Sequence, residues 1–176
     1  AVADALQRLL DAHHPYPGYA LDGHWNVVLT NAAARDMLQW LPLALTQAPI
    51  NVFRVGLHPQ GLAALTSNLH QWGGYLLRQL RALAARSPDP FWAALEREVL
   101  AYETVQAMHQ TDAAEPFAPV LLTPCVLELP VGTVSMFTTL TTFGTPRDIT
   151  LEELCIELFY PTDADSEARL RALAKR

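Results

Sequence analysis

Residues 19–30 read YALDGHWNVVLT, two strand-like runs on either side of an Asp22-Gly23 pair. Asp-Gly between two such runs is a strong short-range signal for a β-hairpin. Asn31 follows directly, and its short side chain can accept a hydrogen bond from a free amide at the start of a helix. The stretch therefore predicts an antiparallel hairpin that leads into a helix over 32–41.

Helices are predicted on both sides of this hairpin. Residues 3–12 place leucines on one face of a short helix, which the run HHPYPG ends at 13–18. After an apolar segment at 51–57, leucines recur every three or four residues from Leu62 to Leu83, which predicts one long helix. Asp89 followed by Pro90 is typical of a helix start, and the apolar stripe behind it continues to Val105.

The last third of the chain changes to strand-like composition. Strands are expected over 120–129 with a bulge at Pro124, over 134–143 and over 154–160, before a final helix that Asp163 caps. The order is typical of an α+β fold with a PAS-like antiparallel sheet. That sheet combines the N-terminal hairpin with a C-terminal three-stranded meander, and the helices are inserted between these parts and packed on one face.

Charge and apolar content limit the classes of function. The formal net charge is −6, with 12 Lys and Arg against 18 Asp and Glu. Binding to duplex DNA needs a basic face, so this chain is a poor DNA binder by itself. No apolar run is long enough for a transmembrane helix, and we predict no membrane association. Two isolated cysteines, Cys125 and Cys155, are expected as buried free thiols in the cytoplasm.

Motifs that carry catalysis are missing from the sequence. The six histidines form neither HExxH nor a Cys/His zinc spacing, and there is no GxSxG, P-loop or GxGxxG motif. We therefore predict that the chain is not an enzyme and holds neither a metal nor a cofactor. Haem or flavin sensing is kept as a minor alternative, which a colourless preparation would remove.

Large apolar side chains instead suggest a binding pocket, because small-molecule sites are mostly apolar with a few polar groups that orient the ligand. Ordinary core packing is the competing interpretation for each aromatic residue taken alone. The predicted ligand-binding residues are Trp25, Phe53, Arg54, Trp72, Leu76, Met136, Phe137, Leu140 and Phe143.

Arg54 is the one charged member of this set. It lies in the apolar segment 51–57, and a cation in such a place needs a partner. One interpretation is a structural salt bridge. The other is that Arg54 binds the anionic or carbonyl end of an elongated, fatty-acid-like ligand.

Four stretches of the chain resemble the MmyB-like ligand-binding domain of actinobacterial regulators of the XRE helix-turn-helix family. Residues 142–157 are the most specific of them. The stretches are LLDAH with PYP at 9–17, DGHWNVV leading to Asn31 at 22–31, NVFR to LHPQGL at 51–62, and TFGTPRDITL with EL and IE at 142–157.

This resemblance implies a sensor of a small molecule, and the apolar residues above favour an apolar or amphiphilic one. DNA would be bound only through a helix-turn-helix domain that precedes residues 1–14, an N-terminal helix and linker, while 15–176 form the PAS-like domain. The resemblance also suggests a homodimer, and the leucines of the two terminal helices are the candidate surface. The alternative is a dimerisation module that has no physiological ligand.

Overall fold

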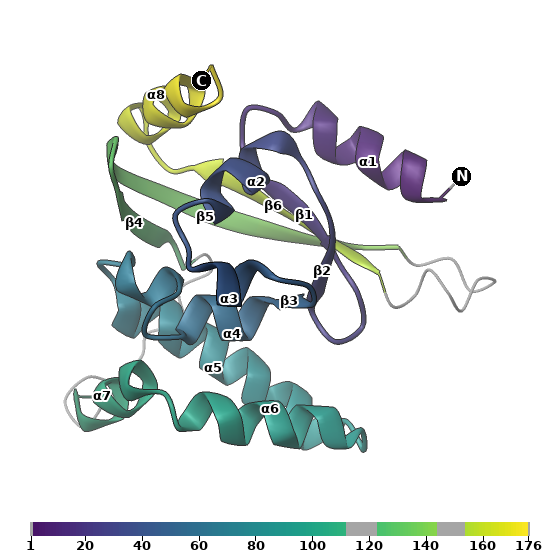
Figure 1. Cartoon of the computed structure of the whole chain (residues 1–176), viewed down its shortest axis with the longest axis vertical. Coiled ribbons are helices and arrows are strands. Elements are labelled where there is room, and N and C mark those ends of the chain that lie inside the picture. Colours follow the sequence, from purple (N-terminus) through teal and green to yellow (C-terminus); the bar gives the residue numbers. More distant parts are fainter. Residues whose placement is uncertain (1, 112–122, 144–153, 176) are drawn as a thin grey trace.

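The computed structural model describes residues 2–111, 123–143 and 154–175, which form a six-stranded antiparallel sheet with helices around it (Figure 1). The sheet order is β3-β2-β1-β6-β5-β4. The α+β, PAS-like fold is thereby confirmed, with a short β3 added next to the hairpin. The strands are β1 (Gly18–Leu21), β2 (Asn26–Thr30), β3 (Ile50–Asn51), β4 (Cys125–Leu129), β5 (Gly132–Thr142) and β6 (Cys155–Pro161).

The helices that the chain inserts between β2 and β4 lie on one side of this sheet (Figure 1). They are α2 (Ala32–Leu38), α3 (Leu43–Thr46), α4 (Val52–Leu57), α5 (Leu69–Arg86), α6 (Pro90–Leu100) and α7 (Glu103–Thr111), with a 3₁₀ turn at Leu62–Ala64. The α4, α5 and α6 helices pack on one another, and Phe53, Trp72, Leu80 and Trp92 belong to the main core with Met136 of the sheet.

The first helix does not follow the predicted one-sided packing, whereas Leu170 of the last helix belongs to the main core with the inserted helices. Helix α1 (Val2–Ala12) covers the opposite face of the sheet, where Leu6 and Leu10 form a second core with Ala20 and Ile156. Helix α8 (Ala164–Leu173) packs against β5 and β6. Of the five leucines predicted for a dimer surface, Leu6, Leu10 and Leu170 are buried within the chain and do not form it, whereas Leu173 is partly buried and Leu9 is 52% exposed.

The hairpin is present, but its turn differs from the predicted two-residue Asp-Gly turn. Asp22 accepts hydrogen bonds from the backbone amides of His24 and Asn26 through Oδ1, each at 2.9 Å. Trp25 has a positive φ of 62°. The aspartate side chain thus organises a longer loop, and β2 begins at Asn26 instead of His24.

The prediction of one long helix from Leu62 is also wrong for the first two turns. Here the chain runs along the sheet edge: the amide of Glu128 donates to the carbonyl of Leu65, and that of Ser67 donates to the carbonyl of Val126. These bonds to β4 replace helical bonds, so α5 begins only at Leu69. Most of the predicted strand at 120–123 lies outside the described residues. No described helix is long and apolar enough to cross a membrane.

Candidate functional site

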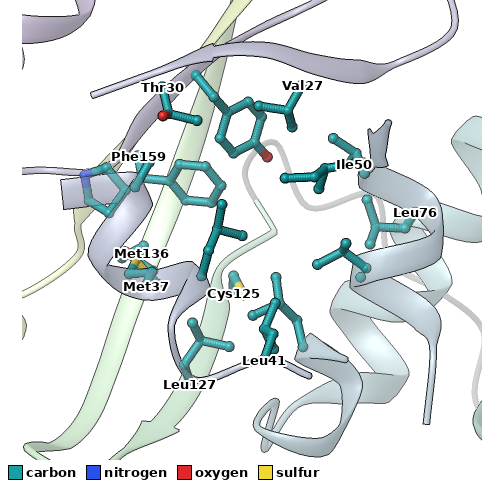
Figure 2. Close-up of a pocket in the computed structure, with 18 of the residues that line it drawn as sticks. Val27, Thr30, Met37, Leu41, Ile50, Leu76, Cys125, Leu127, Met136 and Phe159 are labelled. Atoms are coloured by element: carbon teal, nitrogen blue, oxygen red, sulfur yellow. The ribbon is translucent and has the colours of Figure 1, made fainter. Parts of the chain in front are cut away.

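A cavity of about 80 Å³ lies between the sheet and the inserted helices (Figure 2). A single buried water needs roughly 10–15 Å³, so this space has room for more than one water molecule. The sheet contributes Tyr19, Val27, Thr30, Cys125, Leu127, Met136 and Phe159 to its wall. The helices contribute Ala34, Met37 and Leu38 from α2, Val52, Val55 and Gly56 from α4, and Trp72 and Leu76 from α5.

The wall of this cavity is almost entirely apolar. None of its nineteen lining residues carries a charged side chain, and those able to hydrogen bond are Tyr19, Thr30, Trp72 and Cys125. Burial, and to a smaller extent the nearby Glu157, raise the pKa of the Cys125 thiol well above its ordinary value, so the sulfur is an uncharged, weak hydrogen-bonding group. A site of this kind suits a hydrocarbon body with very few polar atoms.

Three of the predicted ligand-binding residues line the cavity. Trp72 and Leu76 approach it from α5, and Met136 from β5; all three are nearly or fully buried. Trp72 also stacks on Tyr75, with ring centroids 5.5 Å apart. These three remain our candidates for direct contact with a ligand.

The other predicted apolar residues lie elsewhere. Trp25 stacks on the buried Phe53 at 4.9 Å, and neither is among the lining residues. Phe137 stacks on Tyr160 at 5.2 Å, Phe143 packs against the α1 core, and Leu140 is 48% exposed. Since neighbouring residues in a strand point to opposite faces, Phe137 cannot share the cavity with Met136.

Arg54 forms the structural salt bridge that the sequence left open as one interpretation. Its guanidinium donates to both carboxylate oxygens of Glu98 on α6, at 2.8 and 3.0 Å, and joins α4 to α6. Tyr102 donates a further hydrogen bond to Glu98 at 2.8 Å. Hydrogen bonding to Arg54 lowers the pKa of Glu98, although partial burial opposes the shift. Arg54 is not among the residues that line the cavity.

Arg54→Ala should therefore lower the free energy of unfolding by up to about 1 kcal/mol, because the pair is more than a third exposed on its carboxylate side. Urea denaturation of Arg54→Ala, Glu98→Ala and the double variant measures the coupling. Binding of an acidic ligand should be unchanged. A selective loss of acid binding in Arg54→Ala would instead place the guanidinium at the ligand.

Sequence reasoning missed the contribution of α2 and of the first strand. Ala34, Met37 and Leu38 of α2 and Tyr19 of β1 all line the cavity. The signal for Tyr19 was present in the alternation of its strand, because Ala20 faces α1 and its neighbour must face the other way. For α2 there was no comparable signal, since its orientation depends on contacts made far along the chain.

No three His, Cys, Asp or Glu side chains in the described part of the chain gather in a way that could hold a metal ion. A family model described as the MmyB-like transcription regulator ligand binding domain matches residues 2–173. No curated protein matches the chain. The family match spans both faces of the sheet and every element that lines the cavity.

Proposed function

The chain belongs to the family of MmyB-like transcription regulator ligand-binding domains, and we propose that its cavity is where the regulator senses a small molecule. This family is one of regulatory ligand-binding domains and not of enzymes. The single observation that carries the proposal is an apolar cavity enclosed by α2, α4, α5 and the sheet. A core that only held the fold together would be expected to close such a space, since protein interiors are densely packed.

The proposed ligand is a small, largely apolar molecule with one polar end, of which a fatty acid is one example. Its body would contact Trp72, Leu76 and Met136, which provide large apolar surfaces on both sides of the cavity. Each buried methylene contributes about 0.8 kcal/mol, so a chain of several carbons offsets the cost of association.

Ligand binding regulates only if two states of the domain bind the ligand with different affinity. A ligand larger than the cavity would separate α2 or α4 from the sheet, so an expanded state would be the one that it favours. Successive side chains of β1 point to opposite faces of the sheet: Tyr19 lines the cavity, and Ala20 packs against α1. A shift of β1 would therefore reach α1.

We further propose that α1 and the segment up to residue 14 transmit this shift to an XRE-type helix-turn-helix domain on their N-terminal side, with 15–176 as the sensing unit. DNA would then be a partner of the regulator through that other domain. Homodimer formation is part of the same proposal, because regulators that bind paired half-sites are usually two-fold dimers.

A side chain that fills the cavity should weaken the binding of an apolar probe. Ala34→Leu adds three carbons at the cavity wall, and we expect it to weaken 1-octanol at least about tenfold, since the probe and the new side chain compete for one space. Isothermal calorimetry measures the affinity, and thermal melting confirms the fold.

Ala93→Leu is the matched control, because Ala93 is exposed on α6 and away from the cavity. It should bind 1-octanol as the unchanged chain does. If the unchanged chain binds no apolar probe and native mass spectrometry finds no co-purified molecule, the sensor proposal fails, and dimerisation without a ligand becomes the better explanation.

A further inference from the structure

A buried carboxyl group lies in the middle of the sheet. Glu157 is on β6, between Tyr19 of β1 and Leu140 of β5, and only 6% of its surface is exposed. The hydroxyls of Tyr19 and Thr138 come close enough to form hydrogen bonds that favour its ionised form, but the larger effect is burial, which raises its pKa. Its Oε2 atom is buried and has no hydrogen-bond partner among the described residues.

Such a group is costly to the fold. A buried polar atom without a partner has lost its hydrogen bonds to water and gained none in exchange. The ion pairs found in the described ranges all involve other carboxylates, so no cation offsets the burial of Glu157 there. Within the described part of the chain, no positively charged residue is among the causes of its pKa shift, which are burial and two hydroxyls.

Glu157 is next to the cavity but is not one of its lining residues. Its cross-strand neighbour Tyr19 lines the cavity, as does Phe159, which is two positions along β6 and therefore on the same face as Glu157. Glu157 also acts electrostatically on the thiol of Cys125, another lining residue. The carboxyl is thus the cross-strand neighbour of a residue of the cavity wall, and its Oε2 has no hydrogen-bond partner among the described residues.

We propose that Tyr19 and Glu157 form the polar anchor of the cavity and select a ligand that carries a hydroxyl group on an apolar body. The inference rests on the proposed function, because it specifies the polar end of the ligand sensed there. The phenol of Tyr19 contacts the ligand, and Glu157 is a positioning residue that orients this phenol.

A hydroxyl is the group that this pair accommodates best. When Tyr19 donates its proton to Glu157, the phenol oxygen can only accept, so the ligand must donate. An ionised acid offers no proton to the phenol oxygen and would bring its charge into an apolar site beside the Glu157 carboxyl, and an ester also lacks a proton to donate.

Three probes with the same apolar chain separate these cases: 1-octanol, octanoate and methyl octanoate. Calorimetry on the whole chain near neutral pH should give 1-octanol the highest affinity. Tyr19→Phe keeps the ring and removes the hydroxyl. It should weaken 1-octanol by about 5- to 20-fold, the effect of one buried hydrogen bond, and change methyl octanoate by less than about twofold.

Thr30→Val is the matched control, since it removes a different hydroxyl from the cavity wall. It should preserve the preference for the alcohol. Equal affinities for the three probes, a stronger affinity for octanoate, or an equal effect of Tyr19→Phe on all probes would overturn the anchor and leave the sensor proposal standing. If none of the three binds while both variants melt as the unchanged chain does, the anchor and the proposed function fail together.

Discussion

Asn31→Ala will lower the free energy of unfolding by about 3–5 kcal/mol, a large effect for one polar residue. Asn31 is fully buried and uses all its hydrogen-bonding capacity. Its Nδ2 donates to the carbonyls of Leu10 and Tyr16, at 3.0 and 2.8 Å. Its Oδ1 accepts from the amides of Gly18 and Ala34, at 3.1 and 3.0 Å.

The loss is large because alanine removes four hydrogen bonds to backbone groups at once, of which only the Leu10 carbonyl keeps another partner among the described residues, the amide of His13. These groups belong to α1, to the loop before β1, to β1 itself and to the start of α2. The asparagine therefore fixes α2, and with it three residues of the cavity wall, to the first strand.

Chemical denaturation at constant pH measures this loss. Asn31→Asp is the informative control, because it keeps the acceptor for Gly18 and Ala34 but removes the amide that donates to Leu10 and Tyr16. It should be destabilising as well, and the helix cap at Ala34 should survive in it. A loss below about 1 kcal/mol in Asn31→Ala would mean that other groups replace these bonds.

The role of Asn31 also shows what the sequence could and could not predict. Its position before an apolar run predicted the cap on α2 correctly, because capping is local chemistry. The same holds for Asp89 and Asp163, whose side chains cap α6 and α8. The two hydrogen bonds that Asn31 donates to the carbonyls of Leu10 and Tyr16 depend on tertiary packing, and no local pattern in the sequence predicts them.

An apolar cavity could be predicted from the sequence, but only some of the residues that line it could. Trp72 and Leu76 follow from the leucine stripe of α5, because one helical face must turn to the core. Phe137 and Phe143 were predicted as ligand-binding residues from their size alone. Strand alternation places the side chain of Phe137 on the other face of the sheet from that of Met136. Leu140 has the same parity as Met136, but it lies toward the end of β5 where no helix covers it enough to bury it.

Glu157 had no signal in the sequence that separated it from an exposed strand residue. Its neighbours in CIELFY are apolar on both sides, and a lone acidic residue in such a strand usually faces water. Burial follows from the place of β6 in the centre of the sheet, between β1 and β5. That place is a property of topology, which local patterns do not determine.

The contribution of Glu157 to stability should fall as pH rises above the ordinary carboxyl range, and Glu157→Gln should remove this contribution. Burial raises the pKa of Glu157 above its ordinary value of 4.5, so the folded state holds the proton more tightly than the unfolded state does. This stabilising contribution is complete below the unfolded pKa and is lost as the pH rises through the raised folded pKa.

Denaturation of the two proteins at about pH 5 and about pH 8 isolates the carboxyl, because other groups titrate equally in both. Glu157→Gln should be the more stable protein at the higher pH, because its amide carries no charge to bury, and by clearly more than the roughly 0.5 kcal/mol of an ordinary surface substitution. The gap should shrink toward the lower pH.

Glu128→Gln is the matched control. Glu128 is exposed on β4 and accepts a hydrogen bond from Thr133 at 2.8 Å, so neutralising it removes a charge without relieving burial. It should change stability by less than about 0.5 kcal/mol at both pH values. If Glu157→Gln shows no more pH dependence relative to the unchanged chain than Glu128→Gln does, the carboxyl is solvated in the folded protein. An anchor at Tyr19 would then act without it.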